Sequence, residues 1–324
     1  MDLVHSTSTT SSSSSIPPFS TLQSWLNNDS IYNSKLIIDS TEFTVVAKKL
    51  RDFFLSKNFV EAHPQNRLSI LAACEDPFTV ATFNYAGQKW PLPQTGQMWL
   101  EYELLKNPNT PGYFCLSTSY REEPHPVQGR HDLIFPLFEF EMKGDMEDLI
   151  QLETELLEYL GYDTSNHACC RAKYDDVAQK FNTPELSHDH ENQLYANGQT
   201  PAFVLTDFPE STDPFWNMKR TDDGTAKKVD IILSGQETFG SAERETDKQT
   251  MWNRFHTICD GAYKEKLISL FGEDRTMKEI RDYLNFEFFP RSGGGIGMTR
   301  LIRSMKMEGL LQQSNTNAEA DASV

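Results

Sequence analysis

The sequence predicts an α+β fold with several antiparallel strand pairs. Apolar, strand-prone runs at 113–120 and 134–142 are separated by a loop with prolines and Gly129, which is typical of an antiparallel pair. Amphipathic helical patterns occupy 43–57 and 146–160, with apolar residues three or four positions apart. Because helical patterns alternate along the chain with strand candidates such as 229–233, the order of elements favours the α+β class.

The first helix is expected at 43–57, where apolar side chains recur on one face. It leads into a short strand that Pro64 ends. On the residue pattern alone, this face is that of a core helix. It consists of Val45, Val46, Leu50, Phe53 and Phe54.

Further helices are expected at 146–160, 174–181, 248–259 and 277–284. The polar segment 182–199 is expected to be a solvated loop. Its His188–Glu191 run could suggest a metal site, but a solvated loop is favoured, because His-x-His needs a strand and further ligands to bind a metal. Residues 1–18 form a Ser/Thr-rich leader expected to be disordered, and 312–324 form a flexible polar tail. The folded domain is therefore expected at 19–311.

The composition restricts the classes of function. The chain has 324 residues and a net charge of −17, which disfavours a general nucleic-acid-binding surface. No apolar run reaches the roughly 18 residues of a membrane span. Five cysteines without a CxxC pattern, and without a secretory signal, indicate reduced thiols in a cytoplasmic protein. We expect the adjacent Cys169 and Cys170 to be ordinary half-buried thiols.

Charged residues stand at both edges of the loop between the 113–120 and 134–142 runs. Arg121 and Glu123 follow the first run, and Arg130 and His131 precede the second. Arginine presents a planar fork of donors to phosphate or carboxylate. The loop therefore suits an anionic ligand, with a solvated, charge-rich hairpin loop as the alternative.

A glycine-rich turn at 291–300 precedes a helical pattern at 301–311. Glycines let a backbone approach a ligand closely, and a helix start offers free N–H groups to an anion. Arg300 falls in the first turn of this helix. The segment has no Gly-Lys-Ser/Thr and no strand-first GxGxxG, which argues against a Walker loop and a dinucleotide fold.

These two stretches resemble motifs 2 and 3 of the class II aminoacyl-tRNA synthetases, in the aspartate/asparagine/lysine subgroup. Four further stretches match in order: 43–64 resembles motif 1, 95–101 (TGQMWLE) the family's Ser-Gly-Gln-Leu-Tyr-Leu-Glu segment, 202–216 its Val-Thr-Asp-Tyr-Pro…Pro-Phe-Tyr stretch, and 230–244 its Asp–Glu–Arg spacing. Together they cover roughly residues 40–310. The resemblance implies the class II fold, a mixed, mostly antiparallel sheet flanked by helices, and a homodimer interface on the face of the first helix.

The resemblance also implies an amino acid and ATP as substrates, with Mg²⁺. Arg121 would hold the α-phosphate and the substrate carboxylate, and Arg300 the γ-phosphate, which makes these two the catalytic residues. The remaining ATP contacts would come from Glu123 at the adenine amino group, Arg130 and His131 at the outer phosphates, Phe135 under adenine, and Glu237. Asp230 and Glu237 would hold Mg²⁺, Gln97 and Glu139 the substrate ammonium, and Arg244 the polar end of its side chain.

Single residues also fit simpler explanations. Glu139 and Glu141 alternate in a strand and fit a solvent-facing pattern. Glu237 fits a turn cap, and Arg244 fits an ion pair with a neighbouring glutamate along the chain. The common register of three motifs favours the functional roles.

The sequence departs from the family pattern at several points. Thr299 replaces an acidic residue before the motif 3 arginine, so 293–301 is also similar to the ammonia-dependent asparagine synthetase, a class II relative. Ile134 replaces a glutamate, and the motif 2 loop is rich in proline where tRNA-charging relatives carry a loop that touches the acceptor stem. Leu100 stands where aspartate enzymes have a lysine, as in asparagine enzymes.

The leader before residue 43 leaves no room for the N-terminal OB-fold anticodon domain of about a hundred residues. We therefore expect a free-standing core that adenylates aspartate, or asparagine, with ammonia as the preferred acceptor. The alternative is an aspartyl- or asparaginyl-tRNA synthetase-like enzyme, so tRNA is a possible but not favoured partner. A non-catalytic regulator that binds amino acid or nucleotide is a third alternative, which the presence of the phosphate and metal ligands argues against.

Overall fold

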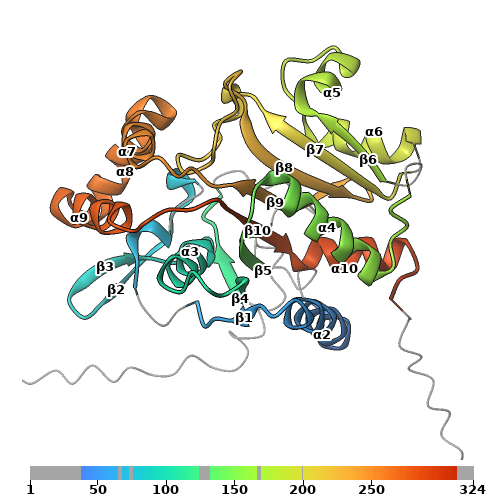
Figure 1. Cartoon of the computed structure of the whole chain (residues 1–324), viewed down its shortest axis with the longest axis horizontal. Coiled ribbons are helices and arrows are strands. Elements are labelled where there is room, and N and C mark those ends of the chain that lie inside the picture. The colour runs from blue at the N-terminus through green and yellow to red at the C-terminus, as the bar shows by residue number, and fades with distance from the viewer. Residues whose placement is uncertain are drawn as a thin grey trace, which may run out of the picture. The chain divides into compact units, whose positions relative to one another are not determined.

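The computed structural model describes residues 38–64, 68–72, 76–123, 132–165, 169–198 and 200–311. Its centre is an eight-stranded sheet in the order β1-β4-β5-β10-β9-β8-β7-β6 (Figure 1). These strands are β1 Val60–Glu61, β4 Gly112–Tyr120, β5 Ile134–Lys143, β6 Cys169–Lys173, β7 Ala202–Phe208, β8 Ala226–Leu233, β9 Gln236–Glu243 and β10 Arg291–Gly297. The β1–β4 and β6–β7 pairs are parallel and the other neighbours are antiparallel. The mixed, mostly antiparallel sheet and the α+β class are confirmed.

Helices flank this sheet. They are α2 Ser40–Ser56, α3 Gln97–Lys106, α4 Met146–Leu160, α5 Tyr174–Phe181, α6 His188–Gly198, α7 Lys248–Thr257, α8 Ala262–Phe271, α9 Glu273–Leu284 and α10 Met298–Met307, with a separate hairpin of β2 Thr82–Tyr85 and β3 Gln88–Pro91. The capping is visible in α4, where the Asp145 side chain accepts from the backbone at residues 147 and 148, and Gly161 ends the helix at φ 105°. A left-handed residue after a helix strongly favours glycine.

The hairpin predicted from the apolar runs is confirmed as β4 and β5. Tyr113 lies opposite Glu141 and Tyr120 opposite Ile134. The tip of the connecting loop, 124–131, is outside the described residues. The predicted phosphate ligands Arg130 and His131 therefore fall outside the described part of the chain.

One face of the sheet is covered by α2, α4 and α10, as Figure 1 shows for α4 across β8 and β9. Phe54 lies in the centre of this layer, with its ring centroid 5.1 Å from that of Phe140. The predicted stripe of α2 belongs to this core: Val46, Leu50 and Phe53 are buried as well. Most of the stripe is thus a core face, while Val45 is 42% exposed. The predicted homodimer, and the predicted role of this helix in its interface, stay predictions.

Two predicted segments differ in structure. Residues 291–297 form the central strand β10 rather than a turn. Its glycines are explained by close packing against the neighbouring strands: a Cβ on Gly293 would lie 2.2 Å from Glu141 Oε2, and one on Gly294 2.3 Å from Ser241 Cβ. The expected loop at 182–199 contains α6, which begins at His188. Leu194 of α6 packs against a buried cluster, so a tertiary contact outweighs the polar composition.

The remaining predictions on the chain's organisation concern thiols, termini and membranes. Cys169 and Cys170 are half-buried free cysteines on β6, as predicted. The predicted leader and tail lie within 1–37 and 312–324, outside the described residues. Of the described helices, none is both long and apolar enough to cross a membrane.

Candidate functional site

A cavity of about 430 Å³ opens on the sheet face opposite α2 and α4. Side chains alternate along a strand, so Glu139 of β5 reaches the cavity while Phe138 and Phe140 enter the core below. Eight of the predicted site residues line it: Gln97, Arg121, Glu123, Phe135, Glu139, Glu237, Arg244 and Arg300. The structure therefore brings together residues from motifs 2 and 3 and from the 95–101 and 230–244 stretches, which lie far apart in the sequence.

The floor of the cavity is the glycine backbone of β10. Gly294, Gly295 and Gly297 line it. A Cβ on Gly295 would fit without a clash, since it would make only ordinary van der Waals contact, nearest to Glu139 Cγ at 3.5 Å. The missing side chains let a ligand approach the sheet closely between β5 and β9.

Glu139 is held at the start of α3. One of its carboxylate oxygens accepts from the Gly96 N–H at 2.7 Å, and the Thr95 and Ser117 hydroxyls also donate to it. A carboxylate at a helix N-terminus is stabilised by the free N–H groups there. Glu139 thus orients α3 and the cavity wall. Its predicted contact to a substrate ammonium stays a prediction.

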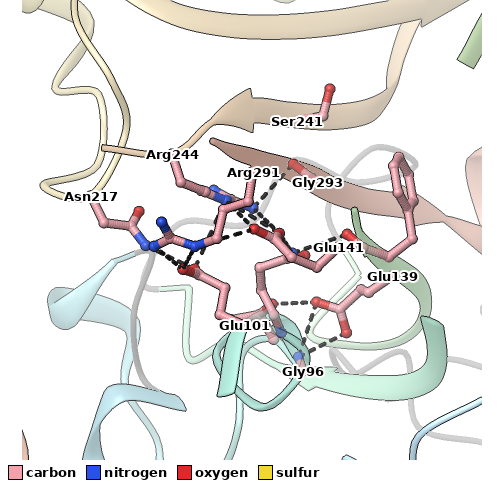
Figure 2. Close-up of polar contacts among 12 residues, drawn as sticks. Gly96, Glu101, Glu139, Glu141, Asn217, Ser241, Arg244, Arg291 and Gly293 are labelled. Carbon is pink, nitrogen blue, oxygen red and sulfur yellow. Dashed lines mark hydrogen bonds and ion pairs between the residues drawn. The ribbon is translucent and has the colours of Figure 1, made fainter. Parts of the chain in front are cut away.

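At one end of the cavity, Arg244 pairs with Glu141 (Figure 2). Arg244 Nη2 lies 3.2 Å from Glu141 Oε2 and donates to the Gly293 carbonyl at 3.0 Å. The Gln97 amide donates to the same glutamate and, at 3.0 Å, to the Phe140 carbonyl. Glu141 is fully buried. The simpler explanations, a solvent-facing Glu141 and an Arg244 paired to a neighbour along the chain, are wrong.

A second buried pair lies behind the first. Arg291 Nη2 is 2.7 Å from Glu101 Oε2, and the Tyr283 hydroxyl donates to the same oxygen at 2.5 Å. Asn217 Nδ2 donates to the other oxygen at 2.8 Å. Glu101 also lies 3.8 Å from Arg244 Nε, so the two pairs form one network. Two guanidinium groups and two carboxylates give it no net charge.

Burial and charge act in opposite directions within this network. Burial favours the neutral form of each carboxyl group, but the charges of Arg291 and Arg244 hold the pKa of Glu101 below its usual value. Burial raises the pKa of Glu141 to about 7, with Glu101 adding to the rise and Arg244 opposing it. Glu101 is thus the firmly ionised carboxylate, and Glu141 is the one whose charge responds to its surroundings.

The predicted metal ligands lie at the other end. Asp230 lines an adjoining cavity of about 280 Å³ that shares Lys228 and Glu237 with the first. Lys228 Nζ lies 2.7 Å from Asp230 Oδ2, while the buried Oδ1 has no hydrogen-bond partner among the described residues. Burial, helped by Glu237, raises the pKa of Asp230 to about 7 against the effect of Lys228.

The two carboxylates face one space above Gly240. A Cβ there would lie 3.3 Å from Glu237 Oε1 and 3.7 Å from Asp230 Oδ1. An orphaned carboxylate oxygen beside a second carboxylate fits Mg²⁺, which takes one or two protein carboxylates and completes its shell with phosphate and water. Among described residues, no group of three or more His, Cys, Asp or Glu is placed to hold a metal, so substrate oxygens would have to complete the shell.

The two predicted catalytic arginines lie at the same end as Asp230 and Glu237. Arg300 is in the first turn of α10, as predicted, and its Nη1 donates to the Glu237 carbonyl at 2.6 Å. Arg121 follows β4, and its guanidinium carbon lies 5.6 Å from the centroid of the Phe135 ring. Both line the cavity. Their positive charges would attract an anionic ligand to the part of the cavity beside Glu237 and Asp230.

The sequence analysis assigned no function to Glu141, Glu101, Arg291 or Lys228. The signal for Glu141 was its alternation with Glu139 in an otherwise apolar strand, which puts two carboxylates on one buried face. Lys228 stands two positions before Asp230 in β8, so the alternation of the strand puts both side chains on one face. No local signal links Arg291 to Glu101, because their contact depends on the sheet bringing β10 against α3.

A model of the family of class II tRNA synthetases for Asp, Lys and Asn (D, K and N) matches residues 32–311. The chain belongs to this family. Among similar proteins, the asparagine–tRNA ligase of Desulforamulus reducens is 22% identical over 291 residues, covering 79% of this chain and 63% of the relative. That of Pelotomaculum thermopropionicum is 32% identical over 114 residues, 35% of this chain and 25% of the relative. The chain thus spans less than two thirds of these relatives.

Solved structures give the same fold. The asparaginyl-tRNA synthetase of Pyrococcus horikoshii complexed with asparaginyl-adenylate superimposes with a TM-score of 0.67 at 20% identity, covering 82% of this chain and 64% of that one. For the asparaginyl-tRNA synthetase of Entamoeba histolytica the TM-score is 0.64 at 17% identity, with 83% and 64% covered. The class II fold is therefore confirmed.

Proposed function

We propose that this protein uses ATP to convert asparagine into an aminoacyl-adenylate and then transfers the aminoacyl group to tRNA. The observation that carries the proposal is the sharing of one cavity by Arg244, which is buried and paired with Glu141, and a cluster of phosphate-type ligands, Arg121, Arg300 and Glu237. One end suits a small polar side chain and the other an anion. Family membership supplies the reaction class.

The charge balance at the Arg244 end of the cavity supports asparagine over aspartate. The oxygen of an amide can accept from Arg244, whose charge Glu141 already balances. A substrate carboxylate would add a second negative charge beside this pair after losing its hydration, which is costly in a buried site. Leu100 is buried among apolar residues, so its position supplies no cation to offset that charge.

The residues at the other end of the cavity, around Arg121 and Arg300, support adenylate formation. A carboxylate oxygen of asparagine would attack the α-phosphorus of ATP, forming the C–O–P linkage as the bond to pyrophosphate breaks. Arg121 would hold the reacting phosphate and carboxylate, and Arg300 the outer phosphates, so that the approaching anions are neutralised and aligned. Asp230 and Glu237 would hold Mg²⁺, which supplies further charge neutralisation on the phosphate oxygens.

The similarity to asparagine–tRNA ligases favours tRNA as the acceptor. The ammonia acceptor expected from the motif 3 departures finds no support among these relatives. It remains a distinct outcome of the test below.

The first experiment measures ATP–pyrophosphate exchange with asparagine, with aspartate and without amino acid. Asparagine-dependent exchange is expected, and its loss in Arg121→Ala and Arg300→Ala, because each charged phosphate contact contributes roughly 1.5–3 kcal/mol or more. Arg171→Ala is the matched control, since this arginine forms an exposed pair with Glu147. Exchange that neither amino acid stimulates would overturn the proposal.

The second experiment identifies the acceptor. The protein is incubated with ATP, Mg²⁺ and asparagine, with total tRNA or without it, and acid-precipitable asparagine is counted. Parallel reactions replace asparagine by aspartate plus ammonium and follow free asparagine. Charging of tRNA supports the proposal, whereas asparagine synthesis that ignores tRNA would replace it with the ammonia-dependent reaction.

A further inference from the structure

We infer that the buried Glu101–Arg291 pair, which does not touch the cavity, sets the charge available at Arg244 and thereby makes the site select an uncharged amide over a carboxylate. The inference rests on the proposed activation of asparagine and adds two residues to its specificity. Both would be positioning residues, acting through Arg244.

The pair is placed to act on the cavity through Arg244. Neither Glu101 nor Arg291 is among the residues that line the cavity, and both are fully buried. Glu101 lies 3.8 Å from Arg244, and Arg291 lies 3.9 Å from Glu141. Figure 2 shows the four side chains converging, with their charged groups facing one another.

The contacts decide which pairs dominate. Glu101 is bound tightly by Arg291 at 2.7 Å, by Tyr283 and by Asn217. Its oxygens are thus occupied, and its contact to Arg244 is the longest that it makes. Arg244 is left to share its guanidinium between Glu141, the Gly293 carbonyl and the cavity.

Removing either member of the pair would change this division in opposite directions. Without the negative charge of Glu101, Arg291 would be free to attract Glu141, and Arg244 would gain net positive charge toward a ligand. Without the positive charge of Arg291, Glu101 would draw Arg244 away and leave net negative charge. The first change favours aspartate and the second disfavours it further. Among buried side chains, where the dielectric constant is lower than in water, such charges act over several ångströms.

The test compares kcat/KM for asparagine and aspartate in pyrophosphate exchange, with binding of both amino acids by calorimetry. In Glu101→Gln, the preference for asparagine should fall by about tenfold or more. In Arg291→Met it should rise. The double variant Glu101→Gln/Arg291→Met restores neutrality and should return the preference to near that of the unaltered protein. It is also the variant most expected to fold, since replacing both members of a buried pair is tolerated better than breaking it.

Glu243→Gln is the matched control. Glu243 is also buried and ion-paired, to Lys219 and Lys227, but it accepts from the Met146 N–H on the α4 side of the sheet. Its loss should leave the preference unchanged. An unchanged preference in folded single variants, or a double variant that keeps the shift of one single variant, would overturn the inference while leaving asparagine activation intact. An unaltered protein that activates neither amino acid would overturn the proposed function as well.

Discussion

At the amino-acid end of the cavity, Arg244 is 5% exposed and has a carboxylate partner within the protein. At the phosphate end, the Arg300 and Glu237 side chains are 27% and 40% exposed and their charged groups lie 3.8 Å apart. Asp230 keeps one oxygen without a partner among the described residues. One end is therefore charge-compensated before any ligand arrives, and the other is arranged so that a ligand completes it.

The difference matches the chemistry proposed for each end. A neutral amide is distinguished from a carboxylate by fixed groups whose orientation does not depend on the ligand, which requires burial and many hydrogen bonds. Phosphates and a metal ion bring their own charges, so their ligands can stay partly solvated. We expect substitutions at the two ends to separate stability from activity.

The largest effect is expected from Arg244→Met, compared with Arg300→Met. Loss of Arg244 leaves Glu141 buried without its cation and should lower the free energy of unfolding by about 3–5 kcal/mol. Loss of the half-exposed Arg300 should change it by about 1 kcal/mol or less. Both variants should lose exchange activity. Urea unfolding followed by circular dichroism would measure the stabilities, and equal losses at the two ends would contradict the comparison.

The glycine floor of β10, which lies between the two ends, allows a sharper test, in which a substitution adds one methyl group. Gly294→Ala places a Cβ 2.3 Å from Ser241 Cβ and 2.5 Å from the Gly240 carbonyl, and should cost roughly 2–3 kcal/mol in unfolding free energy. Gly295→Ala, the neighbouring control, places a Cβ in ordinary van der Waals contact, nearest to Glu139 Cγ at 3.5 Å, and should fold normally while raising the KM for substrates. Thermal denaturation and exchange kinetics would separate the two, and a stable Gly294→Ala would disprove the packing argument.

A buried carboxylate without a cation offers the third contrast. Glu153 of α4 lies on the core side, where burial raises its pKa to about 8. The unfolded chain ionises near pH 4.5, so stability from the neutral folded form is complete below that pH and is lost as pH rises toward 8. Glu153→Gln should therefore gain roughly 2 kcal/mol of relative stability between pH 5 and pH 6.5. Unfolding measured at both pH values checks this, and a pH-independent difference would refute it.

The smallest expected effect belongs to the metal end. Asp230→Asn removes one proposed Mg²⁺ ligand but leaves Lys228, which is 25% exposed, able to reach water. The Mg²⁺ concentration for half-maximal exchange should rise about tenfold or more, with little change in unfolding free energy. Asp223→Asn, at an exposed turn, is the control. An unchanged Mg²⁺ requirement would remove Asp230 from the metal site.

Much of this arrangement could be predicted from sequence, and the exceptions have physical causes. The β4–β5 hairpin and α4 follow from local periodicity, and the motif residues gather in one cavity because their order matched a known family. The Arg291–Glu101 pair could not be found, since its contact spans most of the chain. The periodicity of the α2 stripe predicted the core face that the structure shows for most of it, whereas the dimer interface was implied only by the resemblance and stays a prediction. The glycines of β10 were taken for a turn because their role depends on neighbouring strands.

The glycine backbone of β10 also bears on how such a pocket could evolve. On this floor a side chain at Gly294 would clash with β9, and one at Gly295 would obstruct the ligand, so neither substitution offers a fit to a new amino acid. Change would have to come from the walls, where Glu141, Arg244 and the pair behind them compensate one another. A shift of substrate by mutation would then pass through an unbalanced intermediate, unless two wall residues changed together. The same feature that admits the ligand closely would thus slow the drift of its specificity.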